Sequence, residues 1–220
     1  MRITGTGHLK TGLQIGLLML GVCVSLLGAG ARAQTATQTM AALPAPGAGL
    51  TPGAEARPIL AWTEFCQSYA AECAFDRAEP ARIALTPAIW STIVSINRRV
   101  NRTIDPVTDQ EHWGRADRWD LAEDGRGDCE DFQLLKRKLL AAAGLPRRAM
   151  RMTVVIDEKG EGHAVLTLIT DRGDYILDNK TNAVLTWAQT GYVFIKREGQ
   201  DALAWVSLGG ASSPVTTANR

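Results

Sequence analysis

Residues 125–178 decide the fold, and they read GRGDCEDFQLLKRKLLAAAGLPRRAMRMTVVIDEKGEGHAVLTLITDRGDYILD. In the first part, apolar residues such as Phe132 and Leu139 recur at helical spacing, and Gly144 ends the pattern. After Pro146 the period of the apolar residues changes from about 3.6 to about 2, which indicates strands joined by short turns. Helices followed by an antiparallel meander predict an α+β domain in which helices pack on an antiparallel sheet.

The boundaries of the expected elements follow from these periods. A helix is expected from Pro87 to about Asn101, because Thr86 can cap it and proline suits the first helical position. A second helix is expected over residues 131–143. Strands are expected over residues 150–156, 163–170, 175–177, 184–187, 192–196 and 203–208. Residues 101–124 lack periodicity and predict a long polar loop, a feature that is often functional.

The beginning of the chain has the features of a signal peptide. Arg2 and Lys10 make it positively charged, an apolar run follows, and residues 31–33 (ARA) supply the small residues that signal peptidase requires. We expect cleavage after Ala33, which would remove residues 1–33 and leave a mature protein in the periplasm.

Composition divides the mature chain into three parts. Residues 34–57 are rich in Ala, Thr, Pro and Gly, so we expect a flexible arm. Residues 58–208 have the usual size of one domain with a single core. Residues 209–220 are small and polar, and we expect a flexible tail.

The charges of the chain are balanced. There are 24 Lys and Arg residues against 23 Asp and Glu residues, which gives a formal net charge of +1. The basic residues are scattered, with short pairs such as Arg98-Arg99. This pattern argues against a nucleic-acid partner.

Removal of the signal peptide would leave three cysteines, which are Cys66, Cys73 and Cys129. An odd number in an oxidising compartment suggests one disulfide and one free thiol. Metal binding or redox exchange by Cys66 and Cys73 is the alternative to a disulfide, but the pair forms no CxxC motif and has no histidine nearby. We therefore expect a disulfide between them, with Cys129 as the free thiol.

Cys129 stands where a thiolate would be stabilised. It follows a turn with two glycines and immediately precedes a strong helix, whose dipole and free backbone N–H groups favour negative charge by ~0.3–1 kcal/mol. The same N–H groups can bind the oxyanion of a tetrahedral intermediate. These features predict a nucleophile for acyl transfer.

Three carboxylates, those of Asp128, Glu130 and Asp131, crowd this thiol and should raise its pKa. One interpretation is helix capping and compensation of the dipole by Asp128 and Asp131. The other is a Ca²⁺ site, because clustered carboxylate oxygens suit this ion and its charge would offset theirs.

The mature chain has two histidines, His112 in the long loop and His163 at the start of a strand. The first suggests a surface or packing residue, whereas the second can project toward a helix N-terminus. If the following turn is centred near residues 170 and 171, Asp178 faces His163 across the strand pair. Taken singly, a strand histidine is often structural, and Asp178 can end its strand in an Asx-turn. Beside a free thiol, the pair predicts that His163 is the base for Cys129 and that Asp178 orients it.

Three motifs resemble those of the bacterial transglutaminase-like cysteine proteinases. They are GDCEDF at residues 127–132, GHAVL at residues 162–166 and LDN at residues 177–179. The similarity extends from about Trp62 to Leu208. It implies a papain-like/transglutaminase core with the nucleophile on a central helix, packed against an antiparallel sheet that carries the histidine and the aspartate.

The resemblance also implies a function. It indicates a periplasmic endopeptidase with the triad Cys129, His163 and Asp178, and calcium ligands that map onto Asp128, Glu130 and Asp131. It further implies a large surface adhesin as substrate, whose release disperses biofilm, and an inner-membrane receptor for cyclic di-GMP as inhibitor.

Two other functions use the same residues differently. An acyl-transferring enzyme would pass the thioester to an amine instead of water. A non-catalytic periplasmic binding module would keep the triad as a remnant. We expect the peptidase.

Overall fold

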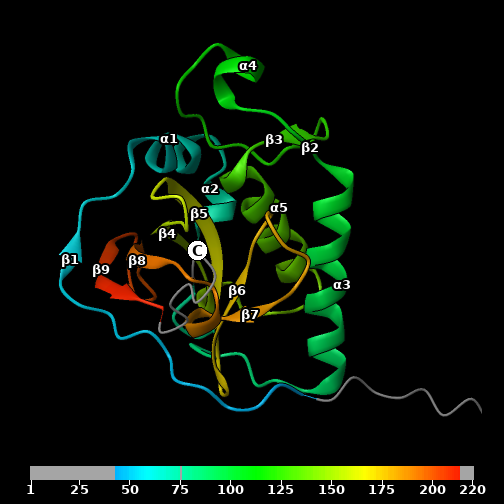
Figure 1. Ribbon diagram of the computed structural model, residues 1–220, viewed down its shortest axis with the longest axis vertical. Helices are drawn as coiled ribbons and strands as arrows, with labels where there is room; N and C mark the ends of the chain where they lie inside the picture. Colours follow the sequence, from blue (N-terminus) through cyan, green and yellow to red (C-terminus); the bar gives the residue numbers. More distant parts are fainter. Residues whose placement is uncertain (1–42, 75, 214–220) are drawn as a thin grey trace, which may run out of the picture. The chain divides into compact units, whose positions relative to one another are not determined.

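The computed structural model describes residues 43–74 and 76–213 of the chain. Their centre is a seven-stranded sheet in which every neighbouring pair of strands is antiparallel. In order across the sheet, the strands are β1 (Glu55–Ala56), β9 (Trp205–Ser212), β8 (Val193–Glu198), β4 (Met150–Ile156), β5 (Gly162–Thr170), β6 (Gly173–Leu177) and β7 (Leu185–Thr186) (Figure 1). The expected class, helices packed on an antiparallel sheet, is confirmed.

Two helices form the main layer on one face of the sheet. α5 (Cys129–Ala142) packs on β5 and β4, and α3 (Pro87–Thr103) packs on α5 (Figure 1). The shorter elements are α1 (Leu60–Ser68), α2 (Ala70–Cys73), α4 (Asp109–Trp113), the 3-10 turns η1 (Arg147–Ala149) and η2 (Trp187–Gln189), and the parallel pair β2 (Asp105–Pro106) and β3 (Arg126–Gly127).

The ends of the two long helices follow from local chemistry. The Thr86 hydroxyl accepts the backbone N–H of Ile89 at 3.2 Å, so it caps α3, and Pro87 takes the first helical position as predicted. After α5, Gly144 has a φ of 89°, a conformation that glycine adopts without strain. The chain then turns back, and the N–H of Leu145 bonds the carbonyl of Leu140 at 3.1 Å.

The sheet buries apolar side chains on both faces. On the helix side, residues such as Met152, Leu166 and Leu177 join the main core. On the other side, a second cluster contains Leu50, Val155, Val165, Ile176, Tyr192, Phe194 and Leu208. Leu50 belongs to the segment that we expected as a flexible arm, so that segment helps to cover the second face.

Parts of the expected arm and tail are therefore built into the sheet. β1 pairs with β9, the N–H of Gly47 bonds the carbonyl of Arg172 at 2.8 Å, and the N–H of Leu50 bonds Asp174 at 2.9 Å. β9 continues beyond residue 208 as far as Ser212. These segments are held by backbone hydrogen bonds, which leave no periodic pattern of apolar residues in the sequence. Their composition, rich in Gly, Ala and Pro, therefore predicted flexibility. The expected signal peptide, residues 1–33, lies outside the described residues.

The long loop expected over residues 101–124 contains regular structure. α4 begins with a capping box, in which Thr108 and Glu111 bond each other's backbone N–H groups. β2 and β3 then pair in parallel and bring the two ends of the loop together. These pieces span five residues or fewer, so they give too short a periodic signal to be read from sequence.

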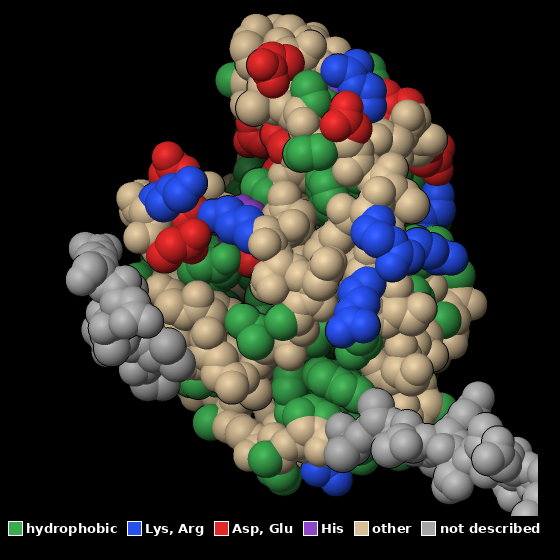
Figure 2. All heavy atoms as spheres, turned by 45° about the vertical axis from the view of Figure 1, so that its right-hand side comes forward, with side chains coloured by type: hydrophobic (Ala, Val, Ile, Leu, Met, Phe, Trp, Pro, Cys, Tyr) green, Lys and Arg blue, Asp and Glu red, His purple; other side chains and the backbone are tan. Residues whose placement is uncertain are grey.

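Charged side chains are unevenly distributed on the surface. In the view of Figure 2, Asp and Glu side chains gather toward the top, where α4 lies, whereas Lys and Arg side chains gather on the side formed by α3. Within residues 43–74 and 76–213, no helix is both long and apolar enough to cross a membrane.

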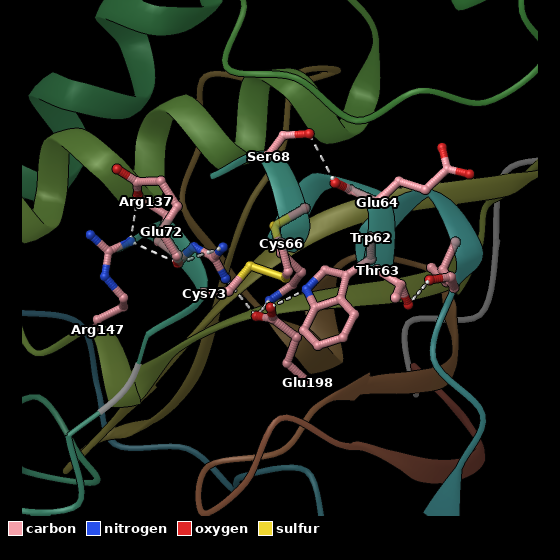
Figure 3. The surroundings of a disulfide bond; sticks show 12 residues. Trp62, Thr63, Glu64, Cys66, Ser68, Glu72, Cys73, Arg137, Arg147 and Glu198 are labelled. Atoms are coloured by element: carbon pink, nitrogen blue, oxygen red, sulfur yellow. Dashed lines mark hydrogen bonds and ion pairs between the residues drawn. A yellow bond between two sulfur atoms is a disulfide. The ribbon is translucent and has the colours of Figure 1, made fainter. Parts of the chain in front are cut away.

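The predicted disulfide between Cys66 and Cys73 is present and joins α1 to α2 (Figure 3). Next to it, the carbonyl of Glu72 accepts hydrogen bonds from Arg137 at 3.3 Å and from Arg147 at 3.1 Å. The disulfide thus fixes a short segment to which two arginines of the domain bond.

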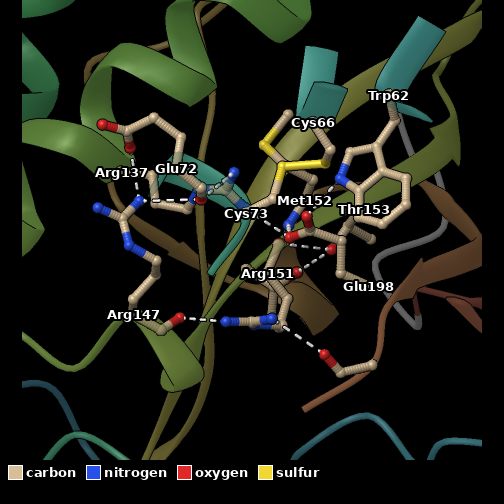
Figure 4. Close-up of polar contacts among 12 residues, drawn as sticks. Trp62, Cys66, Glu72, Cys73, Arg137, Arg147, Arg151, Met152, Thr153 and Glu198 are labelled. Carbon is tan, nitrogen blue, oxygen red and sulfur yellow. Dashed lines mark hydrogen bonds and ion pairs between the residues drawn. A yellow bond between two sulfur atoms is a disulfide. The ribbon is translucent and has the colours of Figure 1, made fainter. Parts of the chain in front are cut away.

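A second buried contact joins α1, α5 and the sheet through Glu198 (Figure 4). Its carboxylate bonds Arg137 at 2.6 Å, the indole N–H of Trp62 at 2.5 Å and the N–H of Met152 at 2.9 Å. Burial alone would raise the pKa of Glu198, but the nearby arginines Arg137 and Arg151 hold it below its ordinary value. The charge of each partner is therefore compensated inside the core.

We predict that Glu198→Gln lowers the free energy of unfolding by about 3 kcal/mol, because it leaves the Arg137 guanidinium buried without a counter-charge. Urea denaturation measures this. The control is Glu123→Gln, which breaks the exposed pair of Lys138 on the same helix and should cost less than about 1 kcal/mol. Equal losses in the two variants would contradict the role assigned to Glu198.

Candidate active site

Cys129 is the first residue of α5, two residues before the helix start predicted from sequence. Cys66 and Cys73 are paired, so Cys129 is the free thiol among the described residues. The chain must approach this helix end closely, because a Cβ atom on Gly127 would lie 2.6 Å from Oδ2 of Asp131. A side chain at position 127 would therefore displace the Asp131 side chain.

Cys129 and His163 line the same cleft, which has a volume of about 230 Å³. α5 supplies the thiol, and the start of β5 supplies the imidazole. Trp119 forms another part of the wall and packs on Trp205 with ring centroids 6.3 Å apart. The packing of α5 on β5 thus brings together a thiol and an imidazole that are 34 positions apart in the chain.

His163 and Asp178 are in contact, with Nε2 and Oδ1 2.9 Å apart and both side chains buried. The expected register was wrong by two residues, because Leu166 pairs with Leu177 and Thr170 pairs with Gly173. A shift of two residues keeps a side chain on the same face of a sheet. Asp178 therefore reaches His163 as a diagonal neighbour, a distance that strand pairs allow.

Three donors hold the Asp178 carboxylate. His163 and the N–H of Lys180 bond Oδ1, at 2.9 and 3.0 Å, and the hydroxyl of Tyr192 donates to Oδ2 at 2.6 Å. The side chain of Asn101 also bonds the Asp178 carbonyl at 2.9 Å. Burial would raise the pKa of Asp178, but these hydrogen bonds and the imidazole lower it.

Tyr192 was missed as a site residue. Its ring stands edge-on to the imidazole of His163, with centroids 5.8 Å apart and planes at 80°. In the sequence it appears as one aromatic residue at the start of a predicted strand, and nothing local links it to residue 178. Its role depends on the order of the strands, which the sequence does not give.

The thiol is in a strongly acidic environment. Its S–H group donates to Oε2 of Glu130 at 3.1 Å. Burial and the Glu130 carboxylate raise the pKa of Cys129 well above its ordinary value, while a hydrogen bond from the N–H of Ala164 acts in the opposite direction. Burial and Asp128 likewise raise the pKa of Glu130 well above its ordinary value. A nucleophile here needs a positive charge close by.

One interpretation of the sequence was that Asp128 and Asp131 cap α5. In the structure their carboxylates do not. Asp128 makes no capping hydrogen bond; its Oδ2 accepts the N–H of Asp109 at 3.3 Å. Asp131 accepts the N–H of Asp120 at 2.6 Å. Burial raises the pKa of Asp131 to about 8.

Asp109 connects the acidic residues around the helix start. Carboxylate oxygens of Asp109, Asp128 and Asp131 lie within 4.8 Å of one another, and so do those of Asp109, Asp117 and Glu130. Asp109 thus lies close to all three residues of the predicted set, Asp128, Glu130 and Asp131, although the sequence analysis gave it no metal-binding role. The signal for it was the capping box of α4, which fixes Asp109 at the first helical position.

One oxygen on each of these three aspartates is buried without a hydrogen bond from any residue that the structure describes. They are Oδ1 of Asp109, Oδ1 of Asp128 and Oδ2 of Asp131. Unpaired buried carboxylate oxygens are costly. Their clustering fits a hard divalent cation, which takes such oxygens as ligands.

One protein family and several solved structures are similar to this chain. Residues 52–213 match the family described as bacterial transglutaminase-like cysteine proteinase BTLCP. No curated protein sequence matches the chain.

Among solved structures, the chain is similar to three forms of Legionella pneumophila LapG. The calcium-bound form has a TM-score of 0.48 and 23% identity, over 58% of this chain and 74% of that chain. A second LapG structure has a TM-score of 0.46 and 24% identity, over 54% and 68%. The EGTA-treated form has a TM-score of 0.46 and 23% identity, over 54% and 67%.

We predict that Tyr192→Phe raises the pKa of Asp178, because it removes a donor to the carboxylate. A carboxylate whose folded pKa lies below its unfolded value adds stability above that value and loses it as the pH falls. The variant should therefore lose about 1.5–3 kcal/mol at neutral pH and show a weaker acid dependence. Carbon-13 NMR of the Asp178 carboxyl group and denaturation at several pH values measure both effects.

The matched control is Tyr175→Phe. This tyrosine is also buried, but its hydroxyl bonds the carbonyl of Ala45 at 3.3 Å. It should leave the pKa of Asp178 unchanged. An unchanged Asp178 pKa in the Tyr192 variant would show that this hydroxyl does not act on the carboxylate.

Proposed function

Because the chain belongs to the bacterial transglutaminase-like cysteine proteinases, which are cysteine peptidases, we propose that Cys129, His163 and Asp178 are its catalytic triad. One observation carries this proposal. His163 lines the same cleft as the free thiol at the start of α5, and its imidazole is paired with the buried Asp178 carboxylate, with Nε2 and Oδ1 2.9 Å apart. A nucleophile, a base and an orienting carboxylate are the groups that acyl-enzyme chemistry requires.

The proposed mechanism assigns a task to each group. Asp178 engages Nε2 of His163, which leaves Nδ1 to take the proton of the Cys129 thiol. The thiolate attacks the scissile carbonyl, and backbone N–H groups of the first turn of α5 stabilise the oxyanion. The imidazolium gives its proton to the leaving amine, and His163 then activates the water that hydrolyses the thioester. The net reaction is hydrolysis of a peptide bond.

We assign the acidic cluster to a calcium ion. Asp109, Asp128 and Asp131 would hold it through their unpaired oxygens, with Glu130 and Asp117 close by. When bound, the ion supplies positive charge that offsets the carboxylates around Cys129 and favours its thiolate. The cluster lies beside the nucleophile. A bound ion would therefore affect both the reactivity of Cys129 and the stability of the first turn of α5.

The location and partners of the enzyme are proposed from the sequence. Residues 1–33 have the features of a signal peptide with cleavage after Ala33, and they support export to the periplasm. The motifs around the triad support a large surface adhesin as the protein substrate. They also support control by an inner-membrane receptor that binds cyclic di-GMP.

We predict that Cys129→Ala abolishes proteolysis, because it removes the nucleophile, while the melting temperature stays within about 2 °C of wild type. Mass spectrometry of proteins released by cells that produce either form measures the activity. Cys129→Ser, which keeps nearly the same shape, is the control for packing and should also be inactive or nearly so. Normal release by the alanine variant would remove Cys129 from the mechanism.

A second prediction concerns the cation. Calcium should raise the melting temperature of the purified protein and EGTA should reverse this, because the ion binds only the folded cluster. Asp131→Asn should lose most of the shift, since it removes one of the unpaired oxygens. Glu161→Gln, which changes an exposed acid near the start of β5, should keep it. An equal calcium shift in the Asp131 and Glu161 variants would contradict this site.

A further inference from the structure

A groove of about 660 Å³ runs along α3, away from the cleft of Cys129. α3 contributes six residues, and four of them are spaced by four positions: Trp90, Val94, Arg98 and Arg102. This spacing places them in one row along the helix. Asn182, Ala183 and Val184 form the opposite wall. The groove is apolar at one end and basic at the other.

The arginines of this helix have no acidic partner among the described residues. Arg98, Arg99 and Arg102 are exposed, and none of them makes an ion pair within 4.0 Å in that part of the chain. The sequence of α3, PAIWSTIVSINRRVNRT, contains no Asp or Glu. In the view of Figure 2, basic side chains gather on this side of the molecule. The groove therefore favours an acidic ligand.

The segments of this chain outside the described residues carry no acidic side chain. Residues 1–42 and 214–220 contain no Asp and no Glu. These residues therefore offer the arginines no acidic side chain, and we look for the acidic occupant of the groove in a partner protein.

The spacing of the row defines the ligand further. Four residues of an α-helix advance about 6 Å along its axis. Two residues of an extended strand advance about 6.7 Å, and their side chains point to the same face. Successive members of the row thus match every second residue of an extended peptide.

We propose that this groove binds an extended segment of a partner protein with the pattern apolar-x-apolar-x-acidic-x-acidic, in either chain direction. The apolar residues pack on Trp90 and Val94, and the acidic residues pair with Arg98 and Arg102. Arg99, one position further around the helix, does not line the groove and takes no part. This binding site is separate from the triad and does not depend on its assignment.

The groove shares a wall with the segment that holds Asp178. Ala183 lines both the groove and a small cavity whose wall includes Asp178 and Tyr192. The side chain of Asn101 bonds the carbonyls of Asp178 and Thr181, both at 2.9 Å. A partner bound here would thus contact the same short segment that carries the proposed triad acid.

The test uses the purified mature protein and a rhodamine-labelled peptide with the core Leu-Ser-Leu-Ser-Asp-Ser-Asp, with binding followed by fluorescence anisotropy. Replacement of both groove arginines (R98E with R102E) should weaken binding by about tenfold or more, because attraction becomes repulsion at two positions. The matched control R99E, with the same charge change per residue on the same helix, should change the affinity less than about twofold. Val94→Ser should weaken binding as well, which tests the apolar end.

Further measurements make the outcome decisive. The double variant R98Q with R102Q repeats the test without repulsion, and circular dichroism checks that each variant is folded. Cys129→Ala should bind as wild type, so that loss of peptidase activity and loss of groove binding are separable. A peptide with the same composition but adjacent Asp residues should bind more weakly.

Three results would overturn the proposal. They are no binding by wild type, equal weakening by R99E, and equal affinity for the rearranged peptide. A dimer in analytical ultracentrifugation that R98E with R102E dissociates would assign the groove to a second copy of this chain and overturn it too.

Discussion

The site depends on the packing of α5 across β5. This contact places the first turn of the helix beside the first residues of the strand, so that Cys129, His163 and Ala164 line one cleft. Both elements are otherwise ordinary: an amphipathic helix with an apolar face and a strand buried on both sides. Their chemistry arises from where their ends meet, since backbone N–H groups are free at a helix start and a strand end can project its side chain into a cleft.

The buried charged groups at the start of α5 differ from two arginines in the core. Within the core, Arg137 is paired with Glu198, and Arg197 is paired with Asp174 at 3.0 Å. At the start of α5, buried aspartate oxygens have no partner among the described residues. Three carboxylate oxygens that are buried side by side without a partner are costly, unlike these paired arginines, and they favour a cation among them. The contrast is the strongest physical support for a ligand at this position, and it is independent of any resemblance to other proteins.

Sequence alone predicted the elements whose signals are local. α3 has a cap and a proline at its start, α5 has an apolar face and a terminal glycine, and β4 to β6 alternate with period two between short turns. The bounds of β4 agree to the residue, and the turn residues that begin at Asp157 mark its C-terminal end. The disulfide was predictable because Cys66 and Cys73 lie only seven positions apart, without a CxxC motif or a nearby histidine, and an odd number of cysteines leaves one thiol free.

What the sequence did not give was the arrangement of distant segments. The roles of Tyr192 and Asp109 depend on the order of the strands and on the path of the loop that contains α4. Leu50 packs in the second apolar cluster, and no periodic pattern of apolar residues around it predicts this. The predicted register of β5 and β6 was wrong by two residues, yet the contact of His163 with Asp178 was predicted correctly. An error of one residue would have put the two side chains on opposite faces, whereas an error of two preserved the face.

The short segment after β6 explains how such a contact can be held. Asp178 lies beyond the last paired residue of β6, Leu177, so the sheet itself does not fix its position. Asn101 bonds the backbone on both sides of the turn, and Asn97 bonds the carbonyl of Asn182 at 3.3 Å. α3 thus replaces the missing strand pairing with side-chain hydrogen bonds. The orientation of the carboxylate is therefore set jointly by the sheet, through Tyr192 and His163, and by a helix that does not itself contact the imidazole.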